Sequence, residues 1–274
     1  MNNQPRDQDG FIILKRTYSD LWQKGHYLTS RTKVMDRIYE YDIRSANTSS
    51  MRSSGKFSSE LMDMLEAMPR DLREKTVGKM IQKDRKVWKI ISTWIKRARE
   101  QLFRANNIQD ADVLSIKNDA VFIIGRKLKQ TKFGYMEFRL KGQYSMYQLI
   151  SKVEFYYDGR HGRVDLKGVN DKILQHPDHQ EGMLKFFLEV FRLASRDQID
   201  DLRAYLIQFT HDYKAKALPH QYYRELNKDN LYRTDMEVAG FVYNLDTATD
   251  QDLDIINPVY NYKRFILPIL QIYL

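Results

Sequence analysis

Alternating apolar and polar residues predict short β-strands in the first part and in the centre of the chain. Residues 38–42 alternate in this way and are expected to form a strand with Asp42 at its end. Residues 112–125 contain two β-rich halves around the polar triplet 117–119, which predicts a hairpin with Asp119 in its turn. Further strands are expected at residues 11–15, 134–140 and 153–157.

Apolar residues spaced three, four and seven apart predict helices. One helix should follow Ser58 as its N-cap and run to about Met68, where Pro69 stops it. The stripe over residues 70–104 predicts a single helix roughly 50 Å long. Two amphipathic helices are expected at 183–194 and 199–213, and the serine-rich residues 45–55 predict a turn-rich loop. A β-rich centre followed by a helical tail predicts an α+β protein.

The composition indicates a folded protein with a polyanionic partner. With 274 residues, 42% of them apolar, the chain can bury one large core or two small ones. Its net charge of +9 favours polyanionic partners over acidic proteins or neutral metabolites. No cysteine is present, so a metal would be bound by oxygen or histidine, with Mg²⁺ as the default. No apolar signal core or long apolar run is found, and we expect a cytoplasmic protein with no membrane partner.

Two aspartates occupy positions that suit phosphoryl transfer. Transfer to a 3′-hydroxyl uses two divalent ions roughly 3.5–4 Å apart, and carboxylates must hold them. A strand end beside the tip of a neighbouring hairpin can bring two carboxylates that close. Asp42 and Asp119 are predicted to hold those two places, although an aspartate in a turn is more often only a turn former.

Four segments, in order, resemble motifs of the family B DNA polymerases. Tyr41-Asp42-Ile-Arg-Ser45-Ala-Asn47 is similar to the D-x-x-S-L-Y motif that opens the palm, and Ile116-Lys-Asn-Asp119-Ala-Val-Phe122 is similar to the hairpin Y-G-D-T-D-S-I-F. Lys141-Gly-Gln-Tyr144 resembles K-x-x-Y, and Lys167-Gly168-Val169 resembles the K-G-[IV] that leads into the thumb.

The resemblance implies a role for each matched residue. Asp42 and Asp119 would be the catalytic ligands of two Mg²⁺ or Mn²⁺ ions. Nucleotide binding would fall to Ser45, Asn47, Lys75, Lys79 and Lys83, and nucleic-acid binding to Lys117, Lys141, Tyr144, Lys167 and Gly168. The partners would be a DNA primer–template and nucleoside triphosphates, with a further subunit supplying missing domains.

It also implies a domain layout for a viral or mobile-element polymerase in the host cytoplasm. Residues 1–50 would open the palm, 51–105 would form reduced helical fingers, 106–165 would complete the palm, and 166–274 would form a thumb-like helical region. The apolar segment from Asn257 onward is expected to pack back onto the palm. No proofreading exonuclease is expected, because only about forty residues precede Asp42.

Several residues depart from the family pattern and keep other functions open. Lys117 replaces the first Asp of D-T-D, Asn47 replaces the sugar-sensing Tyr, and the fingers motif K-x-x-x-N-S-x-Y-G is absent. A polymerase-derived nucleic-acid-binding or structural protein without catalysis is therefore an alternative. A third is a basic nucleic-acid-binding or virion protein whose motif matches are accidental. The segment Gly159-Arg-His161-Gly is interpreted as an exposed turn rather than a catalytic site.

Overall fold

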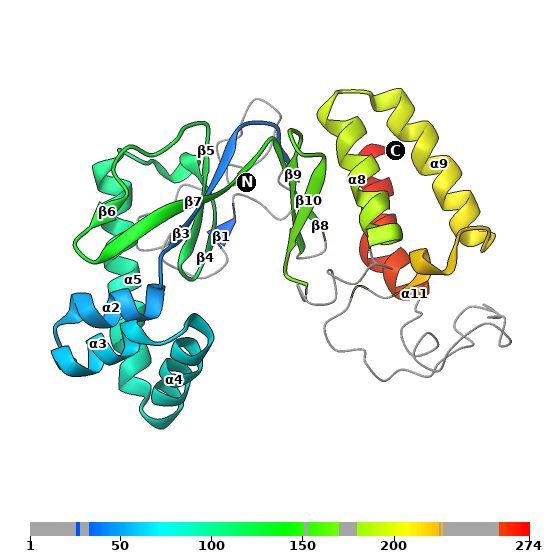
Figure 1. Ribbon diagram of the computed structural model, residues 1–274. Helices are drawn as coiled ribbons and strands as arrows, with labels where there is room; N and C mark the ends of the chain where they lie inside the picture. The colour runs from blue at the N-terminus through cyan, green and yellow to red at the C-terminus, as the bar shows by residue number, and fades with distance from the viewer. Residues whose placement is uncertain (1–25, 28–32, 151–152, 170–179, 225, 227–257) are drawn as a thin grey trace, which may run out of the picture. The chain divides into compact units, whose positions relative to one another are not determined.

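The computed structural model describes residues 26–27, 33–150, 153–169, 180–224, 226 and 258–274. These residues form two compact units (Figure 1). The first unit contains residues 26–27 and 37–143, and the second contains 33–36 and the described residues from 144 onward. The strand expected at 11–15 lies outside the described residues. The α+β class is confirmed, because helices cover largely antiparallel sheets in this chain.

The first unit is built on a six-stranded sheet with the strand order β1-β4-β5-β3-β7-β6. The strands expected at 38–42 and around 134–140 are confirmed as β3 and β7, and the hairpin expected at 112–125 is confirmed as β4 and β5. Pairing is antiparallel between β3 and β5 and between β4 and β5. The strands are β1 (His26–Tyr27), β3 (Ile38–Ile43), β4 (Val113–Lys117), β5 (Ala120–Ile124), β6 (Lys132–Phe133) and β7 (Met136–Tyr144).

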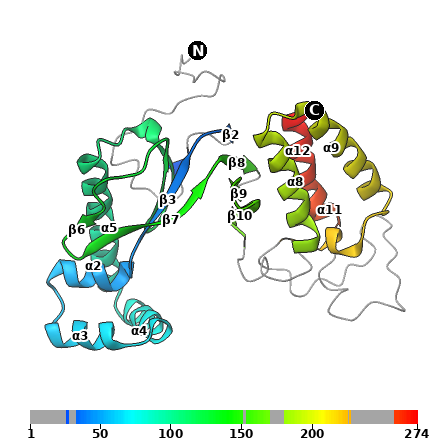
Figure 2. The same cartoon turned by 45° about the horizontal axis from the view of Figure 1, so that its top comes forward.

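The two faces of this sheet differ in chemistry. Tyr39, Tyr41 and Ile43 of β3 belong to the apolar core, together with the buried side of the long helix α5 (Arg85–Ala105), which lies along the sheet (Figure 2). Successive side chains of a strand point to opposite faces. Glu40 and Asp42 therefore point to the other face, and the strand register places Asp42 opposite Ala120 of β5.

Four helices follow one another between β3 and β4. They are α2 (Ala46–Ser54), α3 (Ser59–Ala67), α4 (Arg70–Lys83) and α5. The helix predicted after Ser58 is confirmed as α3, because the Ser58 hydroxyl accepts a hydrogen bond from the Leu61 amide at 3.3 Å.

The turn-rich loop predicted at 45–55 is wrong, because this segment forms helix α2. Serine and threonine favour turns because their hydroxyls compete for backbone groups. In α2 the Ser50 hydroxyl instead donates to the Ala46 carbonyl of the preceding turn, at 2.6 Å. Met51 is fully buried in the core, so tertiary packing overrides the local preference.

The single helix predicted over 70–104 is also wrong, because the chain breaks at Asp84 between α4 and α5. Asp84 has an extended backbone, and its side chain accepts a hydrogen bond from the Lys86 amide at 2.8 Å. It is the N-cap of α5. The apolar spacing continues across the break, so periodicity alone did not reveal it.

The second unit pairs a four-stranded sheet with a group of helices. The strand order is β10-β9-β8-β2, for β2 (Lys33–Val34), β8 (Met146–Ile150), β9 (Val153–Asp158) and β10 (Arg163–Lys167). The predicted helices are confirmed as α8 (Met183–Ser195) and α9 (Ile199–Lys214). The C-terminal helices α11 (Pro258–Asn261) and α12 (Leu267–Tyr273) are joined by a π-helical turn, Tyr262–Ile266.

The C-terminal segment packs within the second unit. Phe265, Ile266 and Ile269 share a core with Phe155 of β9 and Phe187 of α8. The segment packs on β9, which lies within the residues 106–165 expected to complete the palm, and on α8 and α9. Among the described residues, no helix combines the length and apolar character required to cross a membrane.

The capping of α3 gives a prediction for stability. Replacing Ser58 with Ala removes the acceptor for the Leu61 amide and should lower the free energy of unfolding by about 1 kcal/mol in urea titrations. Ser58→Asp keeps an acceptor at the N-cap and should retain most of the stability. Equal losses for the two variants would contradict the capping role.

Candidate active site

The strand register brings Asp42 and Asp119 together on the polar face of the first sheet. Asp119 lies in the two-residue turn of the β4–β5 hairpin, directly before Ala120, which pairs with Asp42. The Ile43 amide donates a hydrogen bond to the Asp119 carbonyl at 3.2 Å, which fixes the turn beside the end of β3. The two carboxyl groups are close enough to share a hydrogen bond when one is protonated.

The pair is electrostatically strained when both groups are ionised. Burial raises the pKa of Asp119 to about 6, and the charge of Asp42 and the hydrogen bond to it act in the same direction. Oδ1 of Asp42 is buried, and no N–H or hydroxyl donor of the described chain reaches it. Positive charge added beside these oxygens would relieve both penalties.

Lys141 of β7 supplies one such positive charge. Its ammonium lies 3.3 Å from Oδ2 of Asp42 and 3.5 Å from Oε1 of Glu40, and Glu40 is buried on the same face of β3. Burial alone would lower the pKa of Lys141, but the charges of Glu40 and Asp42 raise it above its ordinary value. The resemblance to the polymerases assigned Lys141 to nucleic acid, and the structure places it on the carboxylates.

Arg99 holds the β4–β5 hairpin turn by a hydrogen bond, and it was not identified from the sequence as a residue of the site. Its guanidinium, 3% exposed, donates to the carbonyl of Asn118, which has a left-handed backbone in the same turn as Asp119. Burial lowers the pKa of Arg99 to about 10, and Asp119 opposes that shift. The available signal was an arginine lying in register with the apolar stripe of Ile91, Ile95 and Leu102.

The carboxylates open into a pocket of about 590 Å³ in the first unit. Its walls come from β3, the first turn of α2, α4 and β7. Ser45 and Asn47, which the resemblance assigns to nucleotide binding, are among the lining residues. Ser45 accepts a hydrogen bond from Arg73 at 3.3 Å. The charged lining residues are Arg44, Arg70, Arg73, Arg139 and Lys141 on the basic side and Asp42, Glu74 and Asp119 on the acidic side.

The lysines predicted to bind nucleotide lie elsewhere. Lys75, Lys79 and Lys83 are exposed along α4 and do not line this pocket. Arg70 and Arg73 of the same helix line it instead. Their spacing of three residues, which places them on one helix face, was the sequence signal for this pair.

The remaining predicted residues are spread over both units. Lys117 ends β4 just before the hairpin turn. Tyr144, Lys167 and Gly168 belong to the second unit, where Tyr144 is 3% exposed and donates a hydrogen bond to Asp165 at 2.8 Å. The Tyr144 ring is therefore covered within its own unit, and Lys167 lies at the end of β10.

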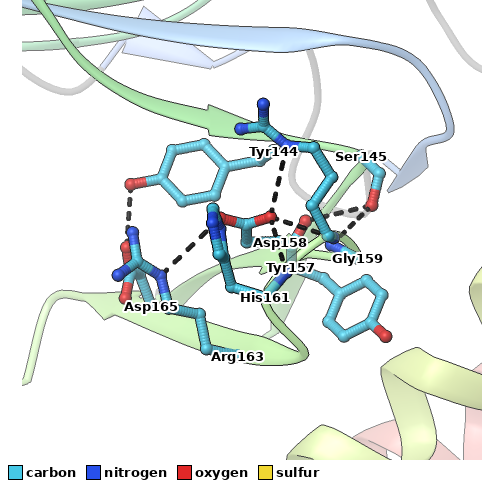
Figure 3. Close-up of polar contacts among 9 residues, drawn as sticks. Tyr144, Ser145, Tyr157, Asp158, Gly159, His161, Arg163 and Asp165 are labelled. Carbon is cyan, nitrogen blue, oxygen red and sulfur yellow. Dashed lines mark hydrogen bonds and ion pairs between the residues drawn. The ribbon is translucent and has the colours of Figure 1, made fainter.

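Figure 3 draws the polar contacts around Tyr144 and the β9–β10 turn. The buried carboxylate of Asp158 contacts Nδ1 of His161 at 2.6 Å and lies 3.7 Å from Nε of both Arg160 and Arg163. Burial alone would raise the pKa of Asp158, but hydrogen bonds from His161 and the Arg160 amide lower it. His161 is exposed in this turn, which agrees with the interpretation of 159–162 as an exposed turn.

The donor set at the first pocket fits a hard divalent cation. Asp42 and Asp119 offer carboxylate oxygens, the ligands that Mg²⁺ and Mn²⁺ prefer. The ammonium of Lys141 already acts as a cation at Asp42. No group of three or more His, Cys, Asp or Glu side chains with metal-binding geometry occurs in the described part of the chain. The remaining ligands would therefore be water or substrate oxygens.

Comparison with known proteins places this chain in a bacteriophage family. The sequence model of the family described as bacteriophage PBS1 gene 130 protein matches residues 17–274. The chain belongs to this family. The family description names a phage gene and no activity, and no curated protein matches the sequence. A viral origin agrees with this membership, and any activity of this family member must be argued from the site.

The strained pair gives a prediction for titration. In the metal-free protein, carboxyl-detected NMR should find a midpoint for Asp119 at about pH 6. Asp42→Asn should lower that midpoint, because it removes the neighbouring charge. The value should stay above 3.8, because burial, the largest cause, remains. Asp112→Asn, which alters a carboxylate paired with Arg126, is the matched control and should leave the midpoint unchanged.

The same shift sets the sign of the pH dependence of stability. A carboxyl pKa that is higher in the folded than in the unfolded state makes the free energy of unfolding fall as the pH rises from about 4 to 6. Asp119→Asn should remove this contribution, on the order of 1 kcal/mol after solvent screening. A wild-type midpoint near 3.8, or none of this slope, would contradict the strained pair.

Proposed function

We propose that this phage protein is a polymerase-type nucleotidyltransferase that adds nucleotides to the 3′-hydroxyl of a DNA primer–template. The observation that carries the proposal is the adjacency of Asp42 and Asp119 within a basic pocket. In this proposal the six-stranded sheet is the palm, α3 to α5 are reduced fingers, and the helices of the second unit are the thumb.

Asp42 and Asp119 would hold two divalent ions, Mg²⁺ or Mn²⁺. When bound, such ions neutralise the charge that develops on the attacking and leaving oxygens during phosphoryl transfer. The β3–β5 register holds the two carboxylates in place, and Arg99 anchors the turn that carries Asp119. These contacts pre-organise the carboxylates, so little rearrangement is needed when substrate arrives.

The arginines of the pocket would bind the triphosphate. Arg70 and Arg73 on α4 and Arg44 and Arg139 at the strands present guanidinium groups, which match phosphate oxygens in geometry and charge. The first turn of α2 also faces the pocket, and the amide groups of a helix N-terminus favour an anion. This arrangement accounts for a surplus of positive charge around an acidic centre.

Lys141 would move from the carboxylates to a phosphate when metal ions bind. Its side chain is 54% exposed, and it is held at the site by ion pairs at 3.3 and 3.5 Å, the first of which is also a hydrogen bond to Asp42. A divalent ion competes with the ammonium for the same oxygen of Asp42. Once displaced, Lys141 is close enough to serve the nucleic-acid role that the K-x-x-Y resemblance implies.

A nucleic-acid-binding protein without catalysis is the second candidate. The ammonium of Lys141 already neutralises part of the charge of Asp42 and Glu40, as a substitute for metal would. Lys117 adds a cation beside the hairpin, where the polymerases have an aspartate. Under this alternative, primer–template binding would not depend on Mg²⁺ or on Asp119.

Primer extension distinguishes the two candidates. The wild-type protein with Mg²⁺ or Mn²⁺ should extend a labelled primer, with deoxy- and ribonucleotides tested separately. Asp42→Asn and Asp119→Asn should each lower the rate on the order of a thousandfold, because each removes a metal ligand. Arg73→Gln should mainly raise KM for the nucleotide, by about tenfold.

Arg126→Gln is the matched control for Arg73→Gln. Arg126 pairs with Asp112 on the surface of the same unit and does not line the pocket, so its loss should leave extension unchanged. Absence of incorporation by the wild-type protein, or full incorporation by Asp119→Asn, would reject the catalytic proposal.

A further inference from the structure

The helical hairpin formed by α4 and α5 carries a dense group of positive charges. Residues 75–97 contain eight lysines and arginines and one acidic residue, Asp84. This segment has a local charge of +7, in a chain whose net charge is +9. All eight side chains are exposed. They are Lys75, Lys79, Lys83, Arg85, Lys86, Lys89, Lys96 and Arg97, and we call them the basic hairpin cluster.

These cations are not neutralised by neighbouring acids. In the described part of the chain, none of the eight forms an ion pair within 4.0 Å. Other arginines of the same unit do, since Arg52 pairs with Glu66, Arg70 with Glu74 and Arg104 with Glu100. A row of unpaired like charges repels itself, and a polyanion relieves that repulsion.

Helical geometry gathers the cluster into rows. Lys75, Lys79 and Lys83 are spaced by four residues along α4. At 100° per residue, the five cluster cations on α5 fall within an arc of about 120°. The opposite side of α5, with Val87, Ile91 and Ile95, is buried in the core of the unit.

An exposed aromatic side chain lies beside the cations on α5. Trp88 is 44% exposed and directly precedes Lys89, near the end of α5 where the two helices meet. Further along the same helix, the guanidinium of Arg97 lies 5.2 Å from the ring centre of Trp94. Phosphate-binding cations interleaved with an exposed aromatic ring are the pattern by which proteins bind single-stranded nucleic acid, because unpaired bases stack on the ring.

We infer that the basic hairpin cluster and Trp88 form a binding surface for single-stranded nucleic acid, outside the carboxylate pocket. The lysines would contact backbone phosphates while a base stacks on Trp88. A membrane surface is less well matched, because the apolar face of α5 is already used in the core and little remains to insert into lipid. The inference shares only the nucleic-acid partner with the proposed function and does not depend on catalysis.

Fluorescence anisotropy with a labelled oligo(dT) of about 20 nucleotides tests the inference, without nucleotide or metal. The triple variant Lys83→Gln/Lys86→Gln/Lys89→Gln should bind at least about tenfold more weakly near 0.1 M salt. The slope of log K against log salt should fall in magnitude by about 2, since each single-strand phosphate contact contributes roughly 0.7.

Matched variants separate this surface from a general charge effect. Lys127→Gln/Lys129→Gln/Lys132→Gln removes three exposed lysines from the same unit and should leave affinity within about twofold. These lysines lie near the C-terminal end of α5, where the Asn106 side chain accepts a hydrogen bond from the Lys129 amide. Trp88→Ala should weaken oligo(dT) binding about tenfold and duplex binding less, whereas Trp88→Phe should retain most of the affinity.

Three outcomes would overturn the inference. One is an equal loss of oligo(dT) affinity in the two triple lysine-to-glutamine variants. Another is oligo(dT) binding by Trp88→Ala that is as tight as that of the wild type. The third is a hairpin triple that keeps its affinity for oligo(dT) but loses binding to vesicles of phosphatidylserine and phosphatidylcholine. Asp119→Asn should bind oligo(dT) like the wild type, so a failure of the catalytic proposal can be distinguished from a failure of this one.

Discussion

Backbone hydrogen bonding between β3 and β5 forces two carboxylates together, and the surrounding structure compensates for the resulting repulsion. The register that pairs Asp42 with Ala120 leaves Asp119 no position except beside Asp42. Two negative charges at this distance in a partly buried site disfavour ionisation, and the pKa of Asp119 rises to about 6. Such a pair of carboxylates is tolerated when positive charge from the protein or from a bound ligand offsets the repulsion.

Three sets of positively charged side chains offset the repulsion between Asp42 and Asp119. Lys141 forms an ion pair with Asp42, the buried Arg99 donates a hydrogen bond to the hairpin turn, and four arginines line the pocket. Arg70 also pairs with Glu74, and Arg44 and Arg139 pair with Glu137, whereas Arg73 donates to the uncharged Ser45 hydroxyl. Arg73 is therefore the pocket arginine that we assign first to an anionic substrate. A site with carboxylates for divalent cations and arginines for phosphates is the kind that the proposed phosphoryl transfer requires.

The parts of this site that depend on local sequence could be predicted, and the parts that depend on packing could not. The alternation in β3 and the polar break at residues 117–119 were sufficient to place Asp42 at a strand end and Asp119 in a turn. Helix α2 was missed because its hydroxyls bond internally and Met51 anchors it in the core. Arg73 lies on α4 and Arg99 on α5, two helices that separate at Asp84, where the apolar spacing gave no sign of a break.

The central claim is that Asp42 and Asp119 act together as a ligand for divalent cations, and electron paramagnetic resonance of Mn²⁺ tests it most directly. At neutral pH the wild-type protein should deplete the signal of free Mn²⁺ in a saturable manner. Asp42→Asn and Asp119→Asn should each abolish this binding, while Asp112→Asn should preserve it. Wild-type protein that binds no Mn²⁺, or binding that survives the loss of either carboxylate, would contradict the account.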